Sequence, residues 1–424
     1  MSSLRKVITL RYAIAFYVSS VLGPSILVMP GLAAKIAGPG SIIAWIGLSL
    51  ASFPFAYTFA SLSARHPESG GVYSFAKEAF GFHTGVVVSW LFAFWFITGA
   101  PAVTLIAASY LGYAFPLTRA ETFLAAVAII LTAFVVNFRG IVVSSKVQLA
   151  VIVSIVVVLV AATLSSLGEV RVSNFSPFLP DGILAVGTAA SLIFWSYLGY
   201  ENVSNVAEEF ENPKRDFVRS IFLSVLLIGV LFVSVSFVTI GTGVYSVGGG
   251  GVAPFAAMLS NVIGRYAAAV IAILTAIIIF GVANAYLTGM SRVIYAASRD
   301  GALPGVLNKL DARTGAPSRA LLALFFSAMI ALVFFYFLNV DLEDALLIPS
   351  GAAIIVYVIG TSAGIKLMRG NATKVLFAGI SLAISLIILP FVGILLAASF
   401  GTILVALLYA TYSVRKGKVT LASK

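Results

Sequence analysis

Long apolar runs recur from one end of the chain to the other, and they constrain its fold more than any other feature. We count about twelve runs near 18 residues or longer, each able to cross the ~30 Å hydrocarbon core of a bilayer as a helix. Only 10% of the residues are charged, whereas a typical soluble domain has about 25%. We therefore predict an all-α integral membrane protein with about 12 transmembrane helices. The two runs that meet near Pro390 are the hardest to separate, so eleven spans are an alternative.

Basic residues are distributed unevenly among the loops, and the net charge is +11. If the N-terminus is cytoplasmic, the only Lys and Arg residues in outside loops are Lys35, Arg119, Arg171 and Arg265. This skew follows the positive-inside rule. It predicts a multi-pass protein of the cell membrane with cytoplasmic N- and C-termini. The basic surplus then faces membrane lipids, and no nucleic-acid partner is expected.

Residue types that catalysis or metal binding requires are scarce. Cys is absent, and the two histidines, His66 and His83, fall near span ends. The predicted spans hold no clustered carboxylates, and the glycines at 248–251 are interpreted as a flexible turn because no lysine follows them. We predict no enzyme, no metal site and no cofactor. A channel is a closer rival, but channel filters are commonly built from symmetric subunits.

Two of the apolar runs are interrupted at their centres. Gly23-Pro24-Ser25 breaks the first run, and residues 196–199 (Ser-Tyr-Leu-Gly) break the sixth. Proline and glycine disfavour a continuous helix, and irregular backbone at membrane depth is tolerated only where it is buried in protein or lines a cavity. A matching pair of broken spans in two halves of a chain points to the binding site of a transporter. The alternative is that these residues merely kink two helices.

The positions of the two breaks also predict the organisation of the chain. Residues 1–166 hold five spans that open with the first break, and residues 167–370 hold five that open with the second. Because five spans cross the membrane an odd number of times, the second set has the inverted topology. Residues 371–424 are expected to add two peripheral helices and a basic cytoplasmic tail.

A broken helix offers an α-amino acid groups of both polarities. The amides that begin a new half-helix, at Ser25, Ile26 and Leu27, favour a carboxylate, whereas the carbonyls that end a half-helix accept an ammonium group. Nearby aromatic residues are interpreted as pocket walls, with packing or interfacial anchoring as the alternative for each. The predicted substrate-binding residues are Ser20, Val21, Gly23, Ser25, Ile26, Leu27, Phe96, Phe194, Trp195, Tyr197, Leu198, Tyr200 and Tyr286.

Glu201 is the one carboxylate that the predicted spans place well inside the membrane. Such groups are usually functional, paired or protonated, so we predict that Glu201 couples transport to protons. The alternative is a permanently protonated, structural carboxyl group. A single intramembrane acid favours a neutral substrate, with a polyamine or arginine exchanger as the alternative. Sodium coupling is also open, because Thr275 and Asn284 supply polar side chains to the eighth span.

Charged residues are dense in the loop that follows the sixth span, at 208–216. We predict a cytoplasmic gate in which Glu208 or Glu209 faces Arg65 or Arg292 when the inside is closed. Solvated turns with helix caps are the alternative.

Short motifs follow one another in a characteristic order, at residues 23–26, 65–73, 80–81, 195–201, 207–216, 299–301 and 315–317. Together they resemble the motifs of amino acid–polyamine–organocation (APC) permeases. Within that family, the combination of Phe53-Pro54, Arg65-His66-Pro67 and residues 210–216 looks closest to bacterial exporters of methionine and branched-chain amino acids. Two departures stand out: Pro24 replaces a small residue, and residues 151–156 lack the lysine that some relatives carry in the fifth span.

The resemblance implies a LeuT/APC-type fold, a 5+5 inverted repeat in which helices 1 and 6 are discontinuous. It implies that spans one, two, six and seven rock against spans three, four, eight and nine, and that Trp195 covers the substrate. The expected function is secondary active transport of neutral, apolar amino acids, by proton coupling or exchange. A receptor that binds amino acids without transporting them is the alternative.

Overall fold

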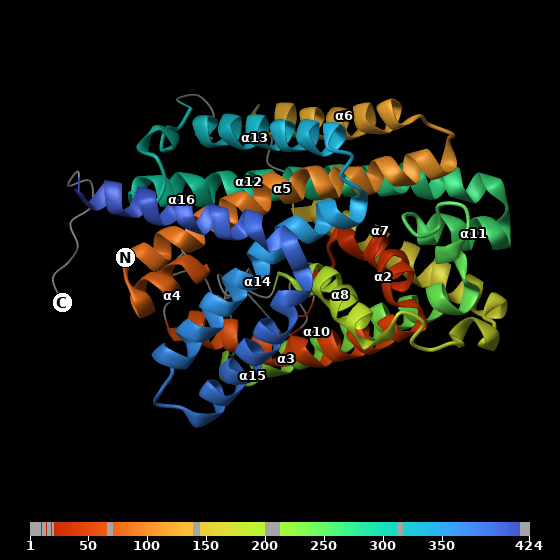
Figure 1. Cartoon of the computed structure of the whole chain (residues 1–424), viewed down its shortest axis with the longest axis horizontal. Coiled ribbons are helices and arrows are strands. Elements are labelled where there is room, and N and C mark those ends of the chain that lie inside the picture. The colour runs from red at the N-terminus through yellow and green to blue at the C-terminus, as the bar shows by residue number, and fades with distance from the viewer. Residues whose placement is uncertain are drawn as a thin grey trace.

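The structure is a computed structural model that describes residues 10, 14, 18, 21–65, 71–138, 145–199, 213–311 and 317–415. Every regular element within these ranges is a helix (Figure 1). The predicted all-α class is confirmed. The C-terminal ends of α3 (Ser41–Arg65), α12 (Arg265–Arg299) and α16 (Leu396–Arg415) lie with the helix α4 (Gly71–Phe80) at one end of the molecule, at the left of Figure 1.

The elements follow the chain in this order: η1 Pro24–Leu27, α2 Met29–Ala37, η2 Gly38–Gly40, α3 Ser41–Arg65, α4 Gly71–Phe80, α5 Phe82–Ala114, α6 Arg119–Phe138, α7 Ser145–Ser166, η3 Leu167–Glu169, η4 Val172–Phe175, α8 Gly182–Ile193, η5 Phe194–Tyr197, α10 Pro213–Thr242, η7 Val244–Ser246, α11 Pro254–Ile263, α12 Arg265–Arg299, η8 Gly305–Leu307, α13 Ser318–Phe337, α14 Leu342–Leu367, α15 Ala372–Ile388, η9 Leu389–Leu395 and α16 Leu396–Arg415. The elements written η are 3₁₀ helices.

Seven helical stretches in the described ranges are long and apolar enough to cross a membrane, which makes the chain a multi-pass membrane protein. Seven is fewer than the predicted twelve, partly because two stretches hold two helices each. Met29–Ser63 contains α2 and most of α3, and Ala372–Arg415 contains α15 and α16. Their connections, η2 and η9, are short 3₁₀ segments, and the backbone leaves helical geometry in each, at Gly38 with φ +55° and at Gly393 with φ +66°. The boundaries that the sequence predicts between these helices are therefore present.

Both predicted helix interruptions are present. At the first, Pro24 opens the short 3₁₀ helix η1, and Val28 separates it from α2 with φ −121°. At the second, α8 gives way to η5, Leu198 is extended and Gly199 has φ +123°. That φ favours glycine, because a Cβ atom is strained there. The sequence signals of proline and glycine therefore located real breaks in the helices.

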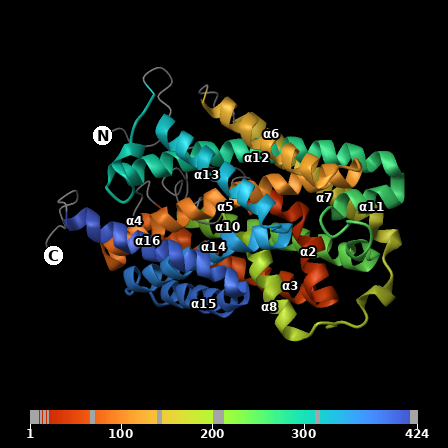
Figure 2. The ribbon, with the colours of Figure 1, turned by 45° about the horizontal axis from the view of Figure 1, so that its top comes forward.

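α5 is the central helix of the bundle. It packs against α12, α14, α16, α4, α6 and α13, and it touches η1 at the first break. α2 and α8, the helices next to the two breaks, pack together and lie side by side in both views (Figures 1 and 2). The breaks are thus held inside the bundle, where irregular backbone is sheltered from lipid.

The outer faces of several helices are apolar and exposed. Examples are Leu226 and Val230 on α10, Phe326 and Ile330 on α13, and Leu404 on α16. Exposed apolar surface of this extent requires a non-aqueous neighbour, which the hydrocarbon of the bilayer supplies.

Candidate functional site

The two helix breaks meet at a pair of buried serine side chains. The Ser196 hydroxyl of η5 donates a hydrogen bond to the Ser25 hydroxyl of η1, with 3.2 Å between the oxygens, although 171 residues separate them. Each residue exposes 1% of its surface. The structure therefore places the predicted breaks at one location in the protein interior.

At the first break, hydrogen bonds keep the short turn in shape. The Val28 amide donates to the Ser25 carbonyl at 3.0 Å, and the Gly23 amide donates to the Val21 carbonyl at 2.6 Å. A helix leaves its first amides without an acceptor inside the helix. Because Pro24 has no N–H, Ser25 is the first residue of η1 that can offer an amide to a bound anion.

The first break is also fixed to α5. The Tyr110 hydroxyl of α5 donates a hydrogen bond to the Leu27 carbonyl, and the tyrosine is fully buried. This bond satisfies a carbonyl that the interruption removes from a regular helical ladder. Tyr110 is not among the predicted site residues, since nothing in an apolar run marks a hydroxyl whose partner is a carbonyl 83 residues away.

At the second break, Trp195 lies against Gly99 of α5. A Cβ atom at Gly99 would stand only 3.1 Å from Cη2 of the indole ring. The absence of a side chain at Gly99 therefore makes room for this ring. Phe96, one turn earlier on α5, is buried as well. Of the two predicted wall residues, Trp195 thus lies between η5 and α5, and Phe96 is buried on α5.

The side chains of Phe194 and Tyr197 anchor η5 to the surrounding helices. Phe194 packs edge-on against Phe55 and Tyr357, with ring centroids 5.7 Å and 5.3 Å away. The Tyr197 hydroxyl lies 2.7 Å from the Ser49 hydroxyl and donates to the Trp45 carbonyl at 3.1 Å. The contacts of both side chains are thus with neighbouring helices, and the predicted contact of their carbonyls with a substrate stays a prediction.

A match to known proteins decides the family. A family model described as "Amino acid permease" matches residues 8–418. The chain belongs to the amino acid permease family. Members of this family are transporters, so the permease is not an enzyme, as predicted.

Curated relatives cover most of the permease. It is 32% identical to the uncharacterized amino acid permease YecA of Bacillus subtilis over 87% of each chain. It is 27% identical to the L-methionine/branched-chain amino acid exporter YjeH of Escherichia coli over 88% of each chain. It is 30% identical to the branched-chain amino acid permease BcaP of B. subtilis over 74% of this chain and 71% of the relative. The predicted resemblance to such exporters is confirmed.

The remaining predicted residues of the permease differ in how far they are buried. Val21, Ile26, Leu27 and Leu198 are buried at the breaks, whereas Tyr286 on α12 is 43% exposed. Other predictions lie outside the described residues or have side chains that are not described, and they stay predictions: Ser20, Tyr200, Glu201, Glu208, Glu209, Asn284, Arg65 and Arg292. Among the residues that are described, no group of three or more His, Cys, Asp or Glu side chains could hold a metal ion.

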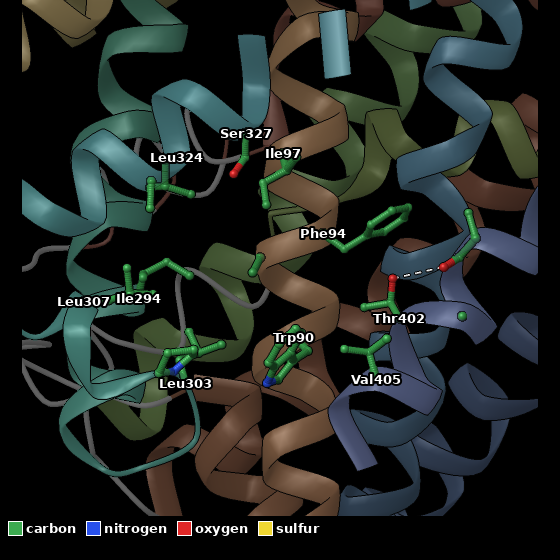
Figure 3. A pocket seen from close by; sticks show the side chains of 15 residues that line it. Trp90, Phe94, Ile97, Ile294, Leu303, Leu307, Leu324, Ser327, Thr402 and Val405 are labelled. Carbon is green, nitrogen blue, oxygen red and sulfur yellow. Dashed lines mark hydrogen bonds between the residues drawn. The ribbon is translucent and has the colours of Figure 1, made fainter. Parts of the chain in front are cut away.

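A cavity of about 520 Å³ lies away from the breaks, between α5, α12, α13 and α16 (Figure 3). None of the predicted substrate-binding residues lines it. At the breaks themselves, Ser25, Ile26 and Ser196 are at most 1% exposed. A substrate that contacts them must therefore be admitted by a movement of the surrounding helices.

Proposed function

We propose that this permease is a secondary active transporter that carries neutral, apolar amino acids across the membrane by alternating access. The observation that carries the proposal is the meeting of the two helix breaks at Ser25 and Ser196. Two broken helices that face each other present amides and carbonyls to the same space, and these groups suit the two charged ends of an amino acid. Their burial is what a closed conformation of such a transporter requires.

The substrate carboxylate binds at the start of η1, where the Ser25 amide and hydroxyl are its donors. Carbonyls at the ends of the two half-helices, including that of Val21, accept the ammonium group. The substrate side chain lies against Trp195 and Phe96, and Gly99 sets the room between α5 and the indole. Gly23, Ile26, Leu27, Tyr200 and Tyr286 complete the proposed lining.

A neutral substrate is supported by the scarcity of charge around the breaks, where Glu201 is the one nearby acid. Residues 21–34, α5 and residues 182–199 contain no Asp, Glu, Lys or Arg. An unpaired charge on a substrate side chain would be costly there, because a buried charge needs a partner. The printed names of YjeH and BcaP, which refer to methionine and branched-chain amino acids, point to the same substrate class.

The same proposal includes the arrangement of the spans. Twelve helices form a 5+5 inverted repeat, residues 1–166 and 167–370, with residues 371–424 at the periphery. Interruption of the first helical run of each half, at η1 and η5, supports this division. Spans one, two, six and seven then move against three, four, eight and nine. The positive-inside distribution of Lys and Arg supports cytoplasmic termini.

Glu201 couples transport to protons in this scheme, and Glu208 or Glu209 closes the cytoplasmic side against Arg65 or Arg292. Sodium coupling is the competing mechanism, and it would use buried hydroxyl groups such as that of Thr275. The two mechanisms differ in their response to Glu201→Gln, which removes a titratable group and leaves a sodium site intact.

Counterflow into proteoliposomes tests the proposal. Vesicles preloaded with unlabelled leucine, methionine, alanine or arginine receive the same labelled amino acid outside, with and without a pH step and a sodium step. We expect uptake of leucine and methionine that follows pH, ignores sodium and loses its pH response in Glu201→Gln. Uptake of arginine alone would contradict the neutral substrate, and binding without uptake would identify a receptor.

A further inference from the structure

The cavity between α5, α12, α13 and α16 is a second site with its own chemistry. We call it the lateral groove, and it is lined by Trp90, Ala93, Phe94, Ile97, Ile294, Leu303, Pro304, Leu307, Ala323, Leu324, Ser327, Ala398, Gly401, Thr402 and Val405. In Figure 3, Trp90, Phe94 and Ile97 extend along α5 between the residues of α13 on one side and those of α16 on the other. Its volume of about 520 Å³ lies within the range of roughly 300–1,000 Å³ found for sites that hold small molecules.

Two of the three polar side chains in the lining, those of Trp90 and Thr402, are hydrogen-bonded to the protein itself, and the third is Ser327. The Trp90 N–H donates to the Ala302 carbonyl at 3.1 Å, and the Thr402 hydroxyl donates to the Ala398 carbonyl at 2.9 Å. What these residues present to the groove is therefore largely ring and methyl carbon. An occupant of this part of the groove gains by apolar contact rather than by hydrogen bonds.

The groove lies in the part of the surface that faces lipid. α13 and α16 both pack on α5 and form the two walls of the lateral groove. Ala398, Gly401 and Val405, which line it from α16, are themselves exposed. Phe326 and Leu404, on the outer faces of the two walls, are 57% and 60% exposed. The hydrocarbon of the bilayer is thus the medium that reaches the groove.

A cation lies at the mouth of the groove. Arg319, in the first turn of α13, is exposed, and its guanidinium donates to the Val306 carbonyl at 3.4 Å, next to the lining residue Leu307. This bond uses one of five N–H donors, and a guanidinium is suited to bind phosphate. Lys309 is a second exposed cation in the same connection, whose described part also holds the acids Asp300 and Asp311.

We propose that a glycerophospholipid binds here, with one acyl chain in the lateral groove and its phosphate on Arg319. The lipid belongs to the leaflet on the side of the α12–α13 connection, which the positive-inside rule assigns to the cytoplasm. The site is separate from the helix breaks. Its test therefore needs no transport and can fail or succeed independently of the proposed function.

Quenching of Trp90 by phospholipids with brominated acyl chains measures occupancy directly. The permease is placed in vesicles of unlabelled phosphatidylcholine with a small, increasing fraction of brominated phosphatidylglycerol. The difference between the native chain and Trp90→Phe isolates Trp90 from the other tryptophans. We expect quenching of Trp90 that saturates at a low fraction of brominated lipid.

Two variants fill the groove. A Cβ atom at Gly401 meets nothing within 4 Å, so Gly401→Leu places a side chain in the groove without disturbing the backbone. Gly401→Leu and Ala398→Leu should both abolish the saturable quenching. Gly47→Leu is the matched control, because Gly47 is an exposed glycine of α3 whose Cβ also meets nothing within 4 Å. If both groove variants are quenched like the native chain, the acyl chain is not in the groove.

The phosphate contact is tested in a separate experiment, in which brominated diacylglycerol serves as the lipid that lacks phosphate. Arg319→Gln should lower the preference for phosphatidylglycerol over diacylglycerol on the order of five-fold, whereas Arg369→Gln should leave it unchanged. Arg369 is an exposed cation that follows α14. Equal loss in both variants would overturn the role of Arg319. A change of oligomeric state in Gly401→Leu without saturable quenching in the native chain would instead identify a second copy as the occupant.

Discussion

The Ser196 hydroxyl donates to the Ser25 hydroxyl at 3.2 Å and joins the two interrupted helices of the permease. Both residues belong to short 3₁₀ helices, η1 and η5, and both are buried. A hydrogen bond of this kind contributes about 0.5–1.5 kcal/mol, which is enough to bias an equilibrium between closed and open conformations several-fold. The contact is therefore positioned to respond when a substrate enters between the breaks.

A double-mutant cycle on these serines tests the coupling of the breaks. Ser25→Ala and Ser196→Ala should each weaken leucine transport several-fold, and the double variant should be little worse than the more damaging single one, because all three lack the same bond. The measurement is the initial rate of leucine counterflow at several substrate concentrations. Fully additive losses would mean that the two hydroxyls act independently.

The space above Gly99 should control the position of Trp195. Gly99→Val adds carbon atoms where a Cβ already stands 3.1 Å from the ring. Overpacking of this kind typically costs about 1–3 kcal/mol, and we expect reduced transport of leucine that Trp195→Phe partly restores. The control is Gly47→Val, where nothing lies within 4 Å. If Trp195→Phe restores no transport, the defect of Gly99→Val does not arise from contact with the indole.

Removal of the Tyr110 hydroxyl should destabilise the first break. In Tyr110→Phe the buried Leu27 carbonyl loses its donor, at a cost of about 1–3 kcal/mol for an unsatisfied buried group. We expect a lower midpoint of thermal unfolding and weaker leucine binding. Tyr113→Phe, whose hydroxyl lies 3.4 Å from that of Ser260, is the control and should change little. Equal midpoints for Tyr110→Phe and the native chain would contradict the anchoring role of Tyr110.

Tyr73 of α4 should make stability sensitive to alkaline pH. Burial, with a contribution from the charge of Asp300, raises the pKa of Tyr73 to about 12. Since an unfolded tyrosine titrates near pH 10, the stability that this group contributes is fully present below about pH 10 and is lost as pH rises toward 12. The thermal midpoint of Tyr73→Phe should therefore fall less between pH 10 and pH 12 than that of the native chain. Identical alkaline curves would show that Tyr73 is not buried in solution as it is here.

The sequence predicted the breaks better than their surroundings. Gly23, Pro24 and Gly199 indicate helix interruptions because their backbone preferences are local properties of the chain. The partners of those interruptions are not local. Tyr110 and Gly99 belong to an uninterrupted apolar run, where a tyrosine or a glycine is ordinary.

The boundary between α2 and α3 is local as well, because Gly38, with φ +55°, interrupts the helical backbone at Gly38-Pro39-Gly40. The roles of Phe194 and Tyr197 are not local. Their backbone position follows from the break, but the direction of their side chains depends on Ser49, Phe55 and Tyr357, which come from other helices.

The claim that the substrate binds between the breaks can be tested with introduced thiols, because the permease has no cysteine. Ser25→Cys and Ser196→Cys each create a single thiol at the proposed site, and Ser246→Cys creates one at an exposed position of η7 as a control. We measure the rate of modification by a small thiol reagent with and without leucine or methionine. Either amino acid should slow modification at positions 25 and 196 and leave position 246 unaffected. Rates at positions 25 and 196 that are the same with and without the amino acid, under conditions in which leucine is transported, would contradict binding between the breaks.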